Sequence, residues 1–257
     1  MLTSRPLILI SNDDGVTAKG INELVRMLHQ SNDIIVMAPD SPRSGSAAAI
    51  TSQTFVNYSH VHHEKGVEIY QCSGTPVDCI KLALDTVVPR IPDLIIGGIN
   101  HGDNSAVNVH YSGTMGIVLE GCMKGIPSIG FSVCDHNPDA DFSHTIPYIQ
   151  RITQETLHHG LPKGICLNVN FPTNPPYKGI KICRQTIGRW EQEWCKCKNP
   201  RSNEDLYWLT GNFTNYEPEK QDNDKWALEQ GYVAITPTQI DMTAYSIMEE
   251  LHKWKLD

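Results

Sequence analysis

Two adjacent carboxylates follow the first apolar segment of this 257-residue chain. The run Leu7–Ile10 stops at SNDDG, so Asp13 and Asp14 stand side by side directly after what reads as a buried strand. Carboxylates suit a helix N-terminus, but one acid would be enough for that. Two adjacent carboxylates need a compensating cation, and oxygen ligands favour Mg²⁺, Mn²⁺ or Ca²⁺. On this motif alone, a helix cap and a metal site both stay open.

Three later loops carry polar groups that could complete a site. Residues 38–46 read APDSPRSGS, where Gly45 beside Ser44 permits close approach of the backbone to a ligand. Asn100, in GGIN, supplies an amide oxygen or a donor, or else closes an Asx turn. The SGT of residues 112–114 places hydroxyls and free N–H groups at the expected start of a helix. Such a terminus can bind phosphate, although a plain N-cap would explain one of the hydroxyls.

Familiar phosphate-binding signatures are missing from the sequence. It contains no G-x-x-x-x-G-K-[ST], and no G-x-G-x-x-G follows the first apolar segment. Residues 14–17 imitate the second half of the haloacid dehalogenase signature D-x-D-G-x-T. Asn12 occupies the nucleophile position of that signature, and an amide cannot form a phosphoaspartate.

Alternating strands and helices must position these loops. Thr75-Pro76-Val77-Asp78 is a strong helix start, with a capping hydroxyl and proline in the first turn. Apolar strands separated by helices are typical of an α/β fold with a doubly wound, mainly parallel (Rossmann-like) sheet, in which ligands bind beyond the carboxyl ends of the strands. We expect one domain over residues 1–257. Strands are predicted at 6–11, 33–38, 67–72, 92–98, 126–132, 164–171 and 180–184, and helices at 21–28, 75–88 and 112–124.

The character of the chain changes in its last third. Residues 185–228 are rich in Trp, Asn, Glu and Lys, with little helical periodicity, and predict an extended β-hairpin arm. Aromatic residues on short strand-like pieces of this arm favour a partner surface, and packing against the parent domain is the alternative. These aromatics are Trp190, Trp194, Tyr207 and Trp208. A final amphipathic helix is predicted at 243–255.

Composition limits the kinds of partner. A formal net charge of −8 gives no long-range attraction for a nucleic acid duplex or an anionic membrane, but allows a small phosphorylated ligand. No apolar stretch approaches the length of a membrane span, and the N-terminal apolar run is too short for a signal peptide. The eight cysteines include no C-x-x-C pair. Most of them are expected to be reduced core residues, so a cytoplasmic location is expected.

The loops together resemble the SurE family, the survival protein E phosphatases that act as nucleotidases. The matching blocks cover most of the chain. They are SNDDG, APD…RSG, GTPVDCIKLAL, PDLIIGGIN, YSGTMG, LNVNFP and GYVAITPTQIDMTA. The resemblance implies a metal-dependent phosphomonoesterase acting on nucleoside 5′- and 3′-monophosphates, with one Mg²⁺ or Mn²⁺ per subunit. It also implies a homodimer or homotetramer built by exchange of the arm or the C-terminal segment.

The same resemblance assigns roles to residues. The implied metal ligands are Asp13, Asp14, Ser44 and Asn100. The two aspartates and Asn100 are also the expected catalytic residues, one aspartate orienting or deprotonating water and the amide holding a phosphoryl oxygen. The expected phosphate- or substrate-binding residues are Asn12, Gly45, Ser112, Gly113 and Thr114.

Three positions depart from the family pattern. The family often has S-G-x-S after the second strand, and residues 44–47 of this chain are SGSA, with Ala47 in place of the second serine. Any contact that the second serine makes would have to come from Ser46 instead. S-G-I-N has become GGIN at 97–100, and the N-x-G that follows has become NSA at 104–106. All implied ligands are present, so we expect activity. Two other functions stay open: a non-catalytic nucleotide or metal sensor, and a hydrolase of other phosphate esters such as polyphosphate.

Overall fold

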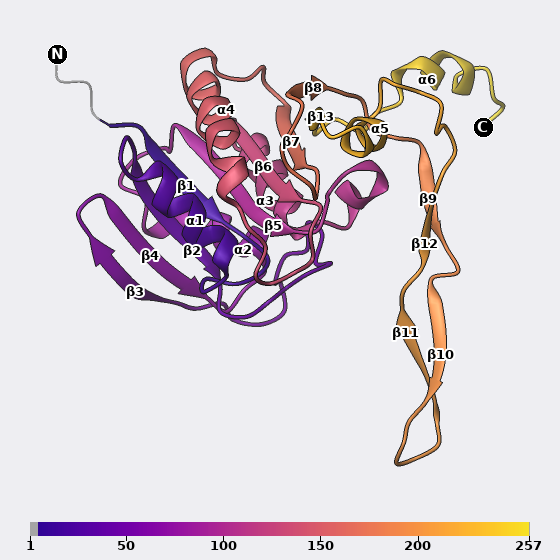
Figure 1. The fold of residues 1–257 in the computed structure, drawn as a ribbon, viewed down its shortest axis with the longest axis horizontal. Helices are drawn as coiled ribbons and strands as arrows, with labels where there is room; N and C mark the ends of the chain where they lie inside the picture. Colours follow the sequence, from indigo (N-terminus) through magenta and orange to yellow (C-terminus); the bar gives the residue numbers. More distant parts are fainter. Residues whose placement is uncertain (1–4, 257) are drawn as a thin grey trace.

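A nine-stranded sheet forms the centre of the structure, a computed structural model that describes residues 5–256 (Figure 1). Its strand order is β3-β4-β2-β1-β5-β6-β7-β13-β8, and all neighbours are parallel except β3 with β4 and β7 with β13. The strands are β1 Leu7–Ser11, β2 Asp33–Pro39, β3 Tyr58–Glu64, β4 Val67–Cys72, β5 Leu94–His101, β6 Ser128–Val133, β7 Ile165–Phe171, β8 Ile180–Ile182 and β13 Val233–Gln239. The α/β fold class with a mainly parallel sheet is confirmed.

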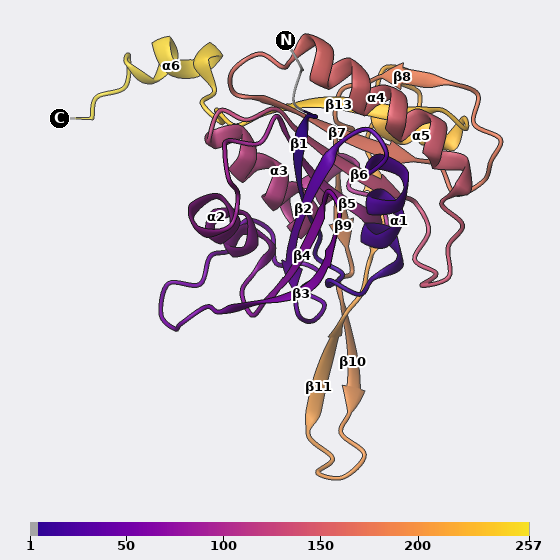
Figure 2. The same ribbon diagram turned by 90° about the vertical axis from the view of Figure 1, so that its left-hand side faces the viewer.

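Helices cover both faces of this sheet (Figure 2). The covering helices are α1 Lys19–Leu28, α2 Pro76–Thr86, α3 Gly113–Met123, α4 Ile146–His159 and α5 Asp224–Glu229. Helix α6 Tyr245–Leu251 stands away from the sheet (Figure 2), and η1 Ala106–His110 and η2 Ser143–Thr145 are short 3₁₀ turns. The predicted start of α2 is confirmed, because Thr75 accepts a hydrogen bond from the N–H of Asp78 and the Asp78 carboxylate accepts one from the N–H of Thr75. This reciprocal capping box satisfies two N–H groups that would otherwise lack partners.

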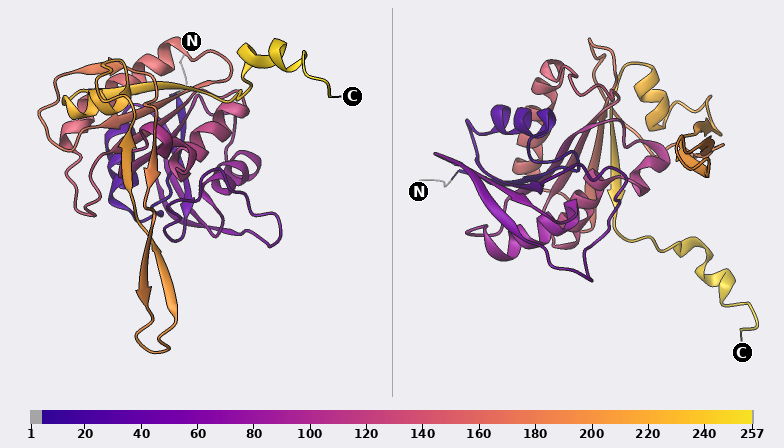
Figure 3. Two further views of the ribbon diagram at one scale, coloured as in Figure 1. Left: turned by 90° about the vertical axis from the view of Figure 1, so that its right-hand side faces the viewer. Right: turned by 90° about the horizontal axis from the view of Figure 1, so that it is seen from below.

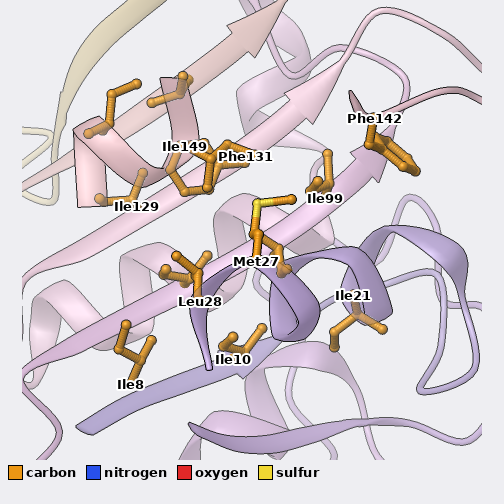
Figure 4. Close-up of a cluster of buried hydrophobic side chains, with 14 of the residues drawn as sticks. Ile8, Ile10, Ile21, Met27, Leu28, Ile99, Ile129, Phe131, Phe142 and Ile149 are labelled. Atoms are coloured by element: carbon orange, nitrogen blue, oxygen red, sulfur yellow. The ribbon is translucent and has the colours of Figure 1, made fainter. Parts of the chain in front are cut away.

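The central strand β1 is buried on both faces. Successive side chains of a strand point to opposite sides, so Ile8 and Ile10 join one core cluster while Leu7 and Leu9 join the other. Figure 4 shows the first cluster between the sheet and the helices, with Ile21, Met27, Leu28 and Ile149. The second cluster includes Cys79 and Ile80 of α2 and Ile117 of α3. Packing on both faces holds the carboxyl end of β1 in place, and the acidic pair follows there.

One long β-hairpin arm, with two consecutive antiparallel ladders along its length, projects from the body (Figures 1 and 3). In it, β9 Gly188–Glu191 pairs with β12 Asn212–Asn215, and β10 Trp194–Lys198 pairs with β11 Asp205–Leu209. The predicted hairpin arm is therefore confirmed, with narrower limits than 185–228. The chain has returned to the body by Asp224, which is 1% exposed and accepts a hydrogen bond from the N–H of Ala106.

Several elements differ from the expectation. β3, α4, α5 and β13 were not predicted, and α6 spans 245–251 rather than 243–255. Its seven residues include no buried side chain. Across residues 5–256, no helix is both long and apolar enough to cross a membrane.

Candidate active site

The acidic pair lies in a loop that Asn12 shapes. The Asn12 amide nitrogen donates to the carbonyl oxygen of Gly15 at 2.9 Å, and its oxygen accepts from the Gly15 N–H at 3.2 Å. The loop is also tied to the end of β2, where the N–H of Val16 donates to the carbonyl oxygen of Pro39. Asn12 is fully buried. Its side chain thus fixes the direction of the acids, and the substrate contact expected of it stays a prediction.

The other predicted loops converge on the acids. The backbone N–H of Arg43, next to Ser44, donates to the carbonyl oxygen of Asp13 at 2.7 Å. The N–H of His101, next to Asn100, lies 3.4 Å from Oδ2 of Asp14. Thr114 Oγ1 donates to Oδ1 of Asp13 at 2.6 Å. Four segments that are far apart in the sequence therefore meet around one pair of carboxylates.

The N-terminus of α3 lies directly against Asp13. A Cβ atom added to Gly113 would lie 2.8 Å from Oδ2 of Asp13 and 2.8 Å from Oγ of Ser46. Only glycine allows this approach, since real Cβ contacts are not that short. The Ser46 hydroxyl is buried and has no hydrogen-bond partner within residues 5–256. An unpartnered buried hydroxyl beside a carboxylate and a helix N-terminus is a group available to a ligand.

Ser112 and Thr114 have different contacts. Ser112 Oγ accepts from the N–H of Met115 at 2.9 Å and caps α3, so its own hydrogen can still be donated to a phosphate. The Thr114 hydroxyl already donates to Asp13, and its side chain is fully buried. Thr114 therefore positions an acid, and any contact that it makes with phosphate would come through its backbone.

Ser44 and Asn100 complete the proposed oxygen ligands. Ser44 is exposed in the loop after β2. Asn100, at the end of β5, is 9% exposed, and its amide nitrogen donates to the carbonyl oxygen of Gly102 at 2.7 Å. This bond fixes the amide orientation and leaves the side-chain oxygen to accept or to coordinate. Gly45, with nothing within 4 Å of an added Cβ, leaves open space beside Ser44.

Burial makes ionisation of the two carboxylates less favourable than in water. Asp13 is 4% exposed, and burial raises its pKa to about 6; the hydrogen bond from Thr114 opposes the rise, and the charge of Asp14 adds to it. Burial also raises the pKa of Asp14, and the hydrogen bond from the N–H of His101 partly offsets that rise. None of the ion pairs within residues 5–256 includes either acid. A buried carboxylate beside a half-buried one, neither of them in an ion pair within residues 5–256, is chemically suited to a divalent cation.

The candidate ligand set differs in composition from metal sites that are built from three or more His, Cys, Asp or Glu side chains. In the described part of the chain, 5–256, no group of three or more such side chains is placed to hold a metal ion. The candidate set combines two carboxylates with a hydroxyl and an amide oxygen. Hard cations such as Mg²⁺ and Mn²⁺ accept this mixture and retain water in the remaining positions.

Comparison with known proteins agrees with the geometry. The sequence model of the family described as Survival protein SurE matches residues 8–192. The chain belongs to the SurE family. It is 63% identical to the 5′-nucleotidase SurE of Phocaeicola vulgatus over the whole of both chains, and 60% identical to that of Bacteroides thetaiotaomicron over 98% of this chain and 97% of the relative. The predicted resemblance is confirmed.

A solved SurE structure also shares the fold. The crystal structure of the SurE protein from Aquifex aeolicus superposes with a TM-score of 0.82 at 31% identity, covering 96% of this chain and 98% of that one. Sequence reasoning did not anticipate three contacts of the SurE-family site: the backbone of Arg43 on Asp13, the hydroxyl of Thr114 on Asp13, and the place of Ser46 beside Gly113. The one signal in the sequence was Ala47 at the position of the family's second serine, because it leaves Ser46 as the nearest hydroxyl.

Proposed function

We propose that this chain is a divalent-metal-dependent nucleotidase that hydrolyses nucleoside 5′-monophosphates, and also 3′-monophosphates, to nucleoside and phosphate. Relatives at about 60% identity over nearly their whole length carry the name 5′-nucleotidase SurE. The observation that carries the proposal is the Asp13–Asp14 pair, which makes no ion pair within residues 5–256 and whose buried member, Asp13, contacts the N-terminus of α3. A cation at the acids and a phosphate at the helix terminus would lie next to each other there.

Asp13, Asp14, Ser44 and Asn100 would hold one Mg²⁺ or Mn²⁺. When bound, the ion polarises the phosphoryl group and lowers the pKa of coordinated water. Asp13 is the better-fixed acid, because a 2.6 Å hydrogen bond from Thr114 and the approach of Gly113 restrict its side chain.

Asp14 suits the role of general base. It is less buried than Asp13, and the hydrogen bond that its carboxylate makes within residues 5–256 is a long one of 3.4 Å from the N–H of His101, so it can turn toward an attacking water. Burial raises its pKa, which makes its carboxylate a better proton acceptor near neutral pH. The hydroxyl of Ser112 and the first N–H groups of α3 would hold the non-bridging oxygens as negative charge develops on them.

The proposal includes a homodimer or homotetramer built through the arm and the C-terminal segment. Both segments present large apolar side chains to solvent: Trp194 is 64% exposed, Trp208 is 74% exposed and Met242 is 81% exposed. Large apolar side chains exposed on such projecting segments favour a protein partner. Light scattering on the intact chain and on a chain lacking residues 192–211 tests this part, with a smaller assembly expected for the shortened chain.

A substrate panel tests the activity. Purified protein is mixed with AMP, GMP, 3′-AMP, p-nitrophenyl phosphate and polyphosphate, with and without Mn²⁺, and phosphate release is measured. Mn²⁺-dependent release from the nucleotides supports the proposal. Release only from the other esters would make the chain a different phosphatase, and binding without release would make it a sensor. Asp14→Asn should lose activity, whereas Asp85→Asn, at an exposed helix position, is the matched control.

A further inference from the structure

A pocket lies at the base of the arm, beside the proposed phosphate site. Its volume is about 420 Å³, within the roughly 300–1,000 Å³ typical of small-molecule sites. Its lining residues are Tyr111, Trp190, Glu193, Leu209, Thr210 and Gly211. Tyr111 directly precedes Ser112, the N-cap of α3. One wall of the pocket is thus one residue away from the phosphate-binding terminus.

The Trp190 ring forms a fixed wall of this pocket. Its Nε1 donates to Oδ1 of Asn108 at 2.8 Å, and Phe213 meets it edge-on at 6.0 Å between ring centroids. An added Cβ at Gly211 would lie 3.3 Å from Cε3 of Trp190. Glycine at this position therefore keeps that edge of the indole ring uncovered. A held ring with an uncovered portion is suited to stacking with a planar group.

Tyr111 links the pocket to the loop that carries Ser44 and Ser46. Its carbonyl oxygen accepts from the N–H of Ala47 at 3.1 Å, which anchors its backbone. The side chain is 59% exposed. Its ring can therefore contact a ligand without first breaking a packed interior.

The charge of the pocket indicates which end of a nucleotide it would take. Apart from the Tyr111 hydroxyl, Glu193 supplies the one ionisable side chain among its lining residues. That carboxylate repels a phosphate, while the N-terminus of α3 attracts one. These charges would orient a nucleotide with its phosphate at Ser112 and its uncharged base toward Trp190.

We propose that this pocket binds the base of the substrate, stacked on Tyr111 and Trp190. The inference rests on the proposed nucleotidase function and adds where the nucleoside is recognised. Stacking on aromatic rings tolerates every base, because each base has a π-face. The site should accept all four common nucleoside monophosphates, with purines favoured over pyrimidines because they cover more ring area.

The test compares two substrates that differ only in the base. For the intact, Mn²⁺-loaded protein, kcat/KM is measured with AMP and with ribose 5-phosphate. Tyr111→Ala should lower the ratio of the two values about tenfold, mainly through KM for AMP. Tyr111→Phe retains the ring and should retain the ratio. The matched control is Tyr207→Ala, which removes an equally exposed tyrosine ring, on the arm, that does not line the pocket.

Two results would overturn the base pocket: an unchanged ratio in Tyr111→Ala, or an equal loss with both substrates, which would indicate a structural role. Adenosine binding, measured by equilibrium dialysis, gives a readout that needs no hydrolysis. Tyr111→Ala should weaken it about tenfold, and unchanged affinity would contradict the proposal. If the wild-type protein releases no phosphate from AMP, the nucleotidase proposal fails separately, and adenosine binding still decides the pocket.

Discussion

Removing the charge of Asp13 should stabilise the metal-free protein. Asp13→Asn keeps the size of the side chain and retains an oxygen that can accept the hydrogen bond from Thr114. The substitution also removes the repulsion between two adjacent carboxylates. A residue expected to be necessary for activity should therefore be unfavourable for folding when no cation is bound.

The magnitude follows from the pKa of Asp13. Its ordinary value is 3.8, and burial raises it to about 6 in the folded protein. Because the folded state holds the proton more tightly than the unfolded chain, the free energy of unfolding falls as pH rises from about 4 to about 6, and stays lower above that. A difference of about 2 pH units corresponds to about 3 kcal/mol. The variant avoids this loss, which for a chain of this size is roughly 6–12 °C in Tm.

Thermal unfolding in EDTA at pH 4 and pH 8 measures the effect. Asp13→Asn should unfold at a higher temperature than wild type at pH 8, and at a similar temperature near pH 4. Asp85→Asn, at an exposed position, should show no gain at either pH. Equal or lower stability of Asp13→Asn at pH 8 would refute the reasoning, because it would mean that the Asp13 carboxylate is well compensated without a metal.

Three further predictions concern the same contacts. Thr114→Val removes the hydroxyl that holds Asp13 and should lower kcat/KM about tenfold or more, whereas Thr114→Ser should retain activity; equal loss in both would contradict this role. Gly113→Ala adds a Cβ 2.8 Å from the Asp13 carboxylate and should cost about 1–3 kcal/mol in urea unfolding and weaken Mn²⁺ binding; unchanged stability would argue against the close approach. Below pH 6, calorimetric Mn²⁺ affinity should fall up to about tenfold per pH unit as a proton competes for Asp13, and a pH-independent affinity would exclude Asp13 as a ligand.

Much of the fold could be predicted because its central strands are largely apolar. β1, β2, β5 and β6 have this pattern, and the glycine and proline signals between them mark their ends. α4 is less visible, since two of its four buried residues, Thr153 and Thr156, are threonines. β3 has seven exposed residues, three of them histidine, and β13 contains Pro237, so neither resembles an ordinary strand.

The candidate site could be predicted as a set of residues but not as a set of contacts. Asp13 and Asp14 are informative because an acidic pair after a buried strand is costly without a partner. That Thr114 donates to Asp13, rather than standing free for phosphate, depends on how closely α3 approaches β1. The Ser46 hydroxyl, which lies beside Gly113 and has no hydrogen-bond partner in the described part of the chain, is a contact of the same kind. Distances of this kind are set by packing across the sheet and cannot be read from spacing in the chain.

The central claim is that the acidic pair holds one divalent cation that hydrolysis requires. It is tested most directly by adding Mn²⁺ stepwise to EDTA-treated, dialysed protein, while bound metal and phosphate release from AMP are measured in the same sample. We predict no release without metal, and activity that rises with occupancy and saturates at one Mn²⁺ per chain. Full hydrolysis of AMP by the metal-free protein would contradict the account.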